Sequence, residues 1–143
     1  MYGLNAVALV FFGCINVAAY QLCKCPEGRR RTVVRWLCAV LLSGNLLRYG
    51  VIYPFVKGVV VLPVEFSTVA YFLVPAILLT SKRQLRSWAA YSGLMAGFFY
   101  YLAMIAAGGV IYGAYAPLDI YISMFCHGSI YFCGFVTIGT ELC

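Results

Sequence analysis

Charge is the scarcest property of this chain. Of its 143 residues only 10% are charged, with four acidic residues, ten basic residues and a single histidine. An ordinary soluble domain carries about 25% charged and about 45–50% apolar residues, whereas this chain is 64% hydrophobic. So few charges cannot solvate the surface of a globule of this size. The composition therefore excludes a soluble domain and predicts a polytopic membrane protein.

The chain also lacks the motifs of cofactor and metal chemistry. It contains no phosphate-binding loop, no dinucleotide fingerprint and no ligand set with metal spacing. We therefore expect no cofactor and no metal. We also expect no nucleic-acid partner, because the basic residues cluster between apolar runs, where they orient a membrane protein and meet anionic headgroups.

The seven cysteines show no spacing typical of a disulfide framework. Cys23 and Cys25 follow the first apolar run, a position that suits reversible palmitoylation. A metal site there is less favoured, because a lone C-x-C pair lacks its other ligands. The other five lie within apolar runs, where a free cysteine behaves as a small hydrophobic residue: Cys14, Cys38, Cys126, Cys133 and Cys143.

Five apolar segments are long enough to cross a bilayer, which takes about 20 residues. No alternating barrel pattern appears, so the need to satisfy the backbone in lipid requires each segment to be a helix. We detect no internal repeat and no low-complexity stretch. The sequence predicts an all-α, polytopic transmembrane helix bundle that forms a single domain, with spans at residues 4–22, 33–55, 59–79, 88–110 and 118–140.

Basic residues are unevenly distributed between the connections. The opposite side carries only Lys57, whereas the first and third connections carry eight bases: Lys24, Arg29, Arg30, Arg31, Arg35, Lys82, Arg83 and Arg86. The positive-inside rule places such connections in the cytoplasm, so we expect a multi-pass protein of the cell membrane with its N-terminus outside and its C-terminus inside. Six bases are expected to meet anionic lipid headgroups: Arg29, Arg30, Arg31, Lys82, Arg83 and Arg86.

Small residues recur at four-residue spacing in the fourth predicted span. Ala89, Gly93 and Gly97 would form one face along which a second helix can approach closely. A contact within the chain is favoured over a dimer, and a homo-oligomer or partner helices remain open as an alternative.

Three ionisable residues interrupt the apolar runs: Arg48, Glu65 and His127. A charge in hydrocarbon costs roughly 2.5–3.5 kcal/mol, so such residues mark functional sites by default. Counting from the span ends, at about 1.5 Å per residue, places all three roughly 10–13 Å from the outer end. Helical spacing adds further members to this predicted polar layer: Asn45, Ser67, Ser123 and Tyr131.

Three interpretations of this layer are open. In the structural one, Arg48 and Glu65 neutralise each other while the polar neighbours hydrogen-bond between helices. In the transport one, Glu65 and His127 exchange protons while Arg48 holds an anion. Five spans without a repeat are few for a secondary transporter, which counts against transport.

The third interpretation is catalysis. Ser67 or Thr68 would be the nucleophile and His127 the base that takes its proton. Glu65 would orient the imidazole. Thr68 shares a helix face with Glu65, whereas Ser67 points about 200° from it on a regular helix. Cys126 directly precedes His127, but adjacent helical positions diverge too far to form a pair.

Three motifs resemble a known family. The stretch Leu62-Pro63-Val64-Glu65-Phe66-Ser67, the basic turn at residues 81–86 and the pair His127-Gly128 resemble the YwaF-type bacterial integral membrane family. That family typically shows Leu-Pro-Leu-His-Leu-Cys, then a short basic connection and a His-Gly pair. The likeness covers residues 59–135, about half of the chain.

The resemblance implies a lipid acyl hydrolase or acyltransferase. The family is similar to the vertebrate androgen-induced lipid-ester hydrolases, and the carry-over puts the nucleophile at Ser67 and the base at His127. Glu65 stands where the family usually has histidine, and Ser67 where it has cysteine, whose intrinsic pKa is lower. Members usually have further spans after the His-Gly pair. We therefore expect a short variant, a fragment or a protein that needs a partner.

Overall fold

The computed structural model describes residues 2–58, 66–80, 82–111 and 116–141. All regular structure within these ranges is helical, which confirms the predicted all-α bundle. The elements in chain order are α1 (Tyr2–Cys23), α2 (Glu27–Leu47), the π-helix η1 (Arg48–Val56), α3 (Phe66–Leu78), α4 (Arg83–Ile111) and α5 (Pro117–Glu141).

Four stretches of helix are long and apolar enough to cross a membrane: α1, α2 together with η1, α4 and α5. Large apolar side chains face outward on the bundle, as in Trp36 and Val110, which are 70% and 78% exposed. Lipid can cover such a surface, whereas water would leave it unfavourably exposed. The helices are thus those of an integral membrane protein.

The third predicted span is only partly described. Helix α3 has 13 residues, about 20 Å at 1.5 Å per residue, which is shorter than a hydrocarbon core of about 30 Å. The first part of the predicted span falls on residues 59–65, outside the described residues. Its full length therefore stays a prediction.

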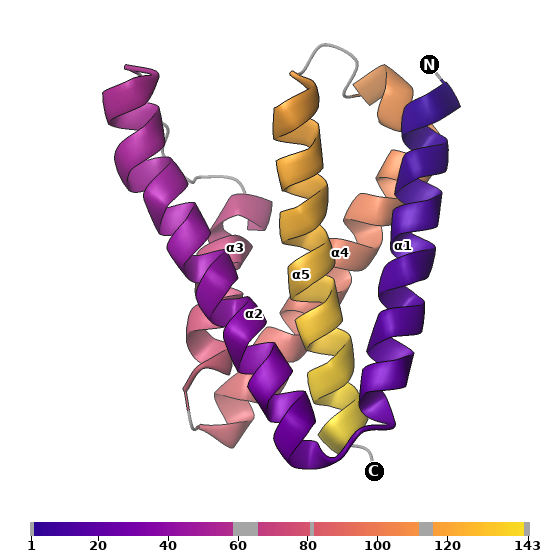
Figure 1. The fold of residues 1–143 in the computed structure, drawn as a ribbon, viewed down its shortest axis with the longest axis vertical. Helices are drawn as coiled ribbons and strands as arrows, with labels where there is room; N and C mark the ends of the chain where they lie inside the picture. Colours follow the sequence, from indigo (N-terminus) through magenta and orange to yellow (C-terminus); the bar gives the residue numbers. More distant parts are fainter. Residues whose placement is uncertain (1, 59–65, 81, 112–115, 142–143) are drawn as a thin grey trace.

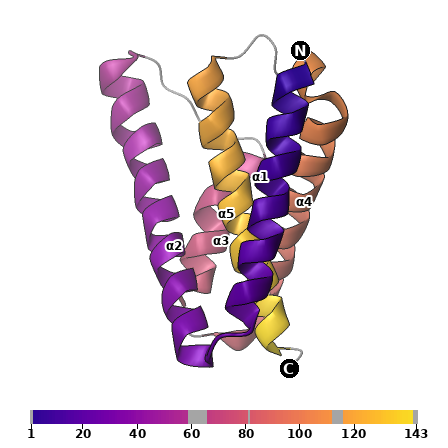
Figure 2. The ribbon, with the colours of Figure 1, turned by 45° about the vertical axis from the view of Figure 1, so that its right-hand side comes forward.

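Consecutive helices run in opposite directions along the bundle (Figures 1 and 2). The α1–α2 and α3–α4 connections lie at the same end, close to the end of α5. Most of the basic residues lie at this end, in the first turns of α2 and α4 that follow these connections. Helix α5 stands in the centre and contacts α1, α2, α3 and α4. This placement means that a polar side chain on α5 can meet partners from any other helix.

Glycines allow α4 and α5 to form the most extensive helix pair of the bundle. A Cβ on Gly93 would lie 2.8 Å from the Ile130 carbonyl oxygen, and one on Gly97 would lie 2.7 Å from that of His127. Real Cβ atoms do not come so close. The predicted small-residue face therefore packs within the chain, which confirms the intramolecular contact.

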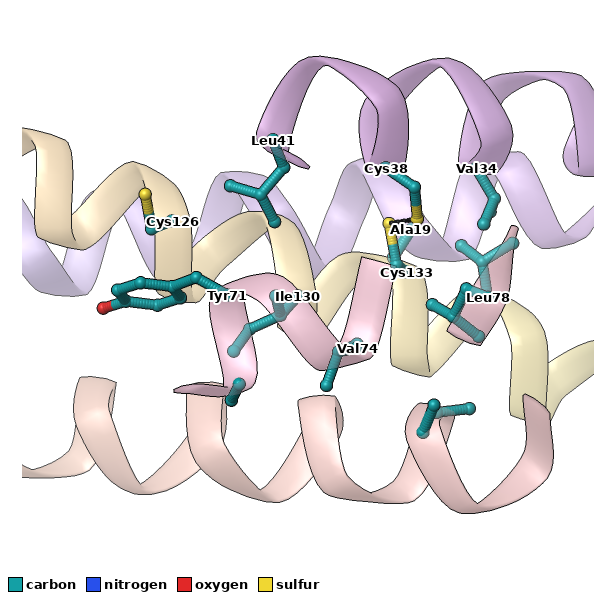
Figure 3. Close-up of a cluster of buried hydrophobic side chains, with 14 residues drawn as sticks. Ala19, Val34, Cys38, Leu41, Tyr71, Val74, Leu78, Cys126, Ile130 and Cys133 are labelled. Carbon is teal, nitrogen blue, oxygen red and sulfur yellow. Dashed lines mark hydrogen bonds between the residues drawn. The ribbon is translucent and has the colours of Figure 1, made fainter. Parts of the chain in front are cut away.

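Buried apolar side chains from all five α-helices form a core cluster of the bundle, most of them from α2, α3 and α5 (Figure 3). The thiols of Cys38 and Cys133 face each other there, with their sulfur atoms 3.8 Å apart. Tyr71 of α3 lies in the same cluster, near Cys126 of α5. The apolar core thus adjoins the polar groups of α5.

Helix α2 continues into η1 without a break, but its hydrogen-bond pattern changes at Arg48. Pro54 lies inside η1 and has no N–H to donate to a regular ladder. Gly58 follows with a φ of 64°, the left-handed conformation that commonly ends a helix. Stretches of π-helix are rare, and those that occur are often found at functional sites. This one carries Arg48 and Tyr49.

Candidate functional site

A histidine near the middle of α5 is the centre of the site. His127 is only 4% exposed. The Tyr71 hydroxyl of α3 lies 2.6 Å from its Nδ1 and 3.2 Å from its Nε2. The Tyr100 ring of α4 stacks on the imidazole, with centroids 3.6 Å apart and planes 7° from parallel. Three helices therefore enclose one imidazole.

The carbonyl of Ser123 indicates which nitrogen of His127 carries the proton. That oxygen lies 3.0 Å from Nδ1, and a carbonyl can only accept a hydrogen bond. We therefore assign the proton to Nδ1, which leaves the lone pair on Nε2. The Tyr71 hydroxyl lies 2.6 Å from Nδ1 and 3.2 Å from Nε2, so with this tautomer its oxygen can accept from Nδ1–H. A neutral imidazole oriented in this way, with its lone pair on Nε2, has the arrangement of a general base.

The predicted nucleophiles lie at the start of α3. Thr68 is buried, one helical turn before Tyr71, and its side chain lies near Tyr49 of η1. Ser67 lies in the first turn of α3, but its side chain is outside the described part, as is all of Glu65. Among the described residues of α3, Tyr71 is the one whose side chain contacts His127.

Arg48 forms an ion pair with a residue that the sequence analysis missed. Its Nη2 lies 3.1 Å from Oδ1 of Asp119, and Nζ of Lys57 lies 3.9 Å from Oδ2. Asp119 precedes His127 by eight residues, or about 12 Å along α5. The predicted pairing of Arg48 with Glu65 lies outside the described residues and stays a prediction. The carboxylate that pairs with Arg48 therefore lies near the start of α5, about two turns before His127.

The other predicted members of the polar layer also have their own partners. Asn45 of α2 is buried and lies 3.8 Å from the Cys126 sulfur. Ser123 Oγ lies 3.4 Å from Nδ1 of His127. Tyr131 donates to Asn16 of α1 across 2.8 Å. Cys126 and His127 therefore face different helices, which confirms their predicted divergence.

Tyr71 and Tyr100 are the site residues that sequence reasoning did not identify. Both lie in apolar runs, where a tyrosine is usual at helix contacts. A signal was present for Tyr71, because it follows Thr68 by three residues and so shares its helix face. Tyr100 carries no comparable signal, since its contact depends on how α4 crosses α5.

An apolar cavity of about 630 Å³ opens between α1, α2 and α5. Its walls include Phe11, Trp36, Gly128 and Phe132, and the last two belong to the part of α5 that carries His127. His127 itself does not line this cavity. The cavity offers room for hydrocarbon on the α1–α2 side of α5.

No group of three or more histidine, cysteine or acidic side chains that could hold a metal occurs among the described residues. The chain matches no family model, and no curated protein and no solved structure matches it significantly. The assignment of a function therefore depends on the geometry of the site.

Proposed function

We propose that this integral membrane protein resides in the cell membrane and acts as a lipid acyl hydrolase or acyltransferase with His127 as its base. One observation carries the proposal: the imidazole of His127, which a carbonyl orients at Nδ1, is buried against α3 at Tyr71, one helical turn after Thr68. This is the logic of an activated nucleophile, in which a third group fixes the base. The resemblance to the YwaF-type family gives the same base.

The chemistry assigns one role to each group. The hydroxyl oxygen of Ser67 or Thr68 attacks the carbonyl carbon of a lipid ester, and its proton passes to Nε2 of His127. The alcohol of the lipid leaves with that proton, and an acyl-enzyme remains. Water then releases a fatty acid, or the hydroxyl of a second lipid takes over the acyl group. Glu65 would balance the imidazolium charge, and Tyr71 would hold the ring in place.

The apolar cavity supports a substrate with a hydrocarbon chain. Its volume of about 630 Å³ lies within the range of about 300–1,000 Å³ that is usual for small-molecule sites. Its walls are apolar side chains of α1, α2 and α5. Such a surface stabilises an acyl chain by about 0.8 kcal/mol per buried CH₂ group.

Labelling with a fluorophosphonate in native membranes tests the proposal. The reagent reacts with an activated hydroxyl, so wild type should be labelled and His127→Ala should lose the label. Either Ser67→Ala or Thr68→Ala should lose it as well, which identifies the nucleophile. Ser43→Ala is the matched control, because this exposed serine of α2 donates to carbonyls of its own helix and should leave labelling unchanged.

Two results would contradict catalysis. One is a folded wild-type protein that the reagent does not label. The other is a label that persists in His127→Ala although Ser67→Ala or Thr68→Ala loses it.

The second candidate is a non-catalytic membrane protein whose polar groups hold the helices together. It is favoured by the number of hydrogen bonds that join helices: Asn5 to the Ile105 carbonyl, Tyr101 to the Met124 carbonyl, and Tyr131 to Asn16. Interhelical bonds of this kind contribute about 0.6 kcal/mol each in membranes. Proton-coupled transport has less support, because Arg48 is already paired with Asp119.

Tyr71→Phe distinguishes the two candidates. It keeps the ring and removes only the hydroxyl. If the contact is structural alone, unfolding in mixed micelles becomes easier by about 0.5–1.5 kcal/mol, and no fluorophosphonate label exists to change. If His127 is a base, labelling slows as well, because the imidazole loses the group that holds it.

A further inference from the structure

A second cavity opens at the end of the bundle that carries the basic connections. It has a volume of about 460 Å³ and lies between α2, α3, α4 and α5. Five arginines line it: Arg30, Arg31, Arg35, Arg83 and Arg86. Thr137 of α5, which also lines it, lies ten residues or about 15 Å from His127. The cavity is therefore distinct from the site at His127.

The charge of this basic cavity is strongly unbalanced. Among the described residues, Glu27 is the acidic one that lines it, and its carboxylate already pairs with Arg31. Arg30 donates from Nη1 to the Cys23 carbonyl, 3.1 Å away, which is a neutral acceptor. No ion pair to Arg30, Arg35, Arg83 or Arg86 occurs among the described residues. Like charges at this density repel one another, so the site favours an anion.

Two arginines each hold a buried donor that no described group satisfies. Nε of Arg30 and Nε of Arg86 are both buried, and neither has a hydrogen-bond partner among the described residues. An unsatisfied buried donor costs about 1–3 kcal/mol, and more when it is charged. The guanidinium edge that contains Nε matches two oxygens of a phosphate. A phosphate that contacts either edge would satisfy the donor there.

The helix ends at the cavity strengthen the case for an anion. Helix α2 begins at Glu27 and α4 at Arg83, and the amino end of a helix carries partial positive charge. The first turn of α4 contains no acidic residue and holds both Arg83 and Arg86. Cations are unfavourable at that end unless an anion is also present.

The carboxyl end of α3 does not explain these arginines. This end would attract a cation through its free carbonyl groups. The Thr80 hydroxyl, however, already donates to the Ile77 carbonyl across 2.7 Å, and the Leu79 amide donates to the Pro75 carbonyl across 3.0 Å. Two of the last four carbonyls of α3, those of Pro75 and Ile77, are therefore satisfied locally.

We propose that this basic cavity binds the phosphate of an anionic phospholipid headgroup, with Arg30 and Arg86 as its principal ligands. The position favours a lipid over a soluble phosphate compound, because Val34, Leu78 and Val136 also line the cavity and provide apolar wall for the start of an acyl chain. Basic pockets between membrane helices on the cytoplasmic side bind such headgroups. The proposal does not depend on catalysis at His127.

Four of the six predicted headgroup contacts line the cavity: Arg30, Arg31, Arg83 and Arg86. Arg35 joins them, whereas Arg29 and Lys82 are not among the lining residues. Binding in a defined cavity should depend on the arginines that line it, whereas a general attraction of the basic end for anionic headgroups should depend equally on all six bases. A base outside the cavity therefore serves as the control. Arg29 adjoins Arg30 in sequence and has the same charge, but it is exposed and lies outside the cavity.

Binding of short-chain phosphatidic acid to the purified full chain in neutral detergent tests the proposal. Arg86→Gln and Arg30→Gln should each weaken binding by about tenfold or more, because each removes a charge-assisted bond. Arg86→Lys should also weaken it, since lysine keeps the charge but lacks Nε. Arg29→Gln should bind like wild type. Each Gln variant has one positive charge fewer in or near the cavity, so repulsion between the arginines decreases. Thermal unfolding checks that each variant is folded.

Comparison of probes separates a lipid from a soluble ligand. Short-chain phosphatidylcholine with the same acyl chains should bind weakly, because its headgroup has no net charge. Inorganic phosphate should also bind more weakly than phosphatidic acid. The assignment to a lipid is overturned if phosphate binds as tightly. The site itself is overturned if folded Arg30→Gln and Arg86→Gln bind like wild type, or if Arg29→Gln loses as much affinity as they do.

Discussion

His127 occupies a position in which an unpaired imidazole would be costly. Its ring is stacked on Tyr100, and both nitrogens lie within reach of the Tyr71 hydroxyl. These contacts keep the ring in one orientation, which both a base and a structural bond between helices require. Access distinguishes the two, because a base needs a path for its substrate and a structural bond does not.

Asp119 illustrates a residue whose role depends on its partner. The side chains of Arg48 and Asp119 are 16% and 34% exposed. Their ion pair therefore lies between a surface pair and a fully buried pair, the two cases for which salt-bridge energies are known. Asp119→Asn leaves Arg48 without its carboxylate, and we expect a loss of about 1–3 kcal/mol in the free energy of unfolding.

The double variant Arg48→Met with Asp119→Leu checks that expectation. It removes both charges, so it should recover most of the loss seen for Asp119→Asn when unfolding is measured in mixed micelles. Additive losses would mean that the two residues do not interact.

The close contact between α4 and α5 determines how closely the residues around His127 can pack. Gly97 of α4 packs against the backbone of α5 at His127, so any larger side chain must push the two helices apart. We expect Gly97→Val to destabilise the protein by about 1–3 kcal/mol through overpacking. It should also weaken the stacking of Tyr100 on His127, since both residues lie at this crossing.

Gly44 of α2 is the matched control for Gly97. No atom outside its own helix lies within 4 Å of a Cβ built there, and the residue is exposed. Gly44→Ala should therefore stabilise the helix by about 0.5–1 kcal/mol. If both substitutions have the same small effect on thermal unfolding, the close α4–α5 contact is wrong.

The packing of α2 on α5 can be measured through two native thiols. Cys38 and Cys133 are buried with their sulfur atoms 3.8 Å apart, so a small membrane-permeable oxidant should link them. We expect mass spectrometry to find the Cys38–Cys133 peptide pair in a chain whose other cysteines are serine. Cys14 faces outward on α1, and a chain that keeps only Cys14 and Cys133 should give no internal link. The absence of a Cys38–Cys133 link in the folded protein would contradict this packing.

The fold could be predicted from the sequence because lipid leaves few choices. Apolar length identifies helices, and the spacing of Ala89, Gly93 and Gly97 identified a contact face correctly. The site could be predicted only in part. His127 stood out because ionisable residues are rare in these runs, but its partners depend on helix rotation and crossing, which composition does not encode. Asp119 was missed because it lies at the start of a predicted span, where an acidic residue needs no explanation.

The orientation of the whole bundle is open to a direct test. In a chain without native cysteines, Lys57→Cys should react with an impermeant maleimide added to intact cells, because the positive-inside rule places it outside. Arg29→Cys should react only after the membrane is permeabilised. The reverse pattern would invert the bundle and place the basic cavity at the outer surface.

The central position of α5 has a consequence for biogenesis. In the hydrophobic windows of α1 and of α2 with η1, 11% and 17% of the residues are buried, against 61% in α5. Helix α5 leaves the ribosome after the other four, so its partners must enter the bilayer before the helix that joins them exists. Until then, the polar side chains of Tyr71, Asn45 and Asn16 would lie in the membrane without their α5 partners. Assembly of this protein should accordingly depend on whatever shelters unpaired polar side chains of newly inserted helices until synthesis reaches α5.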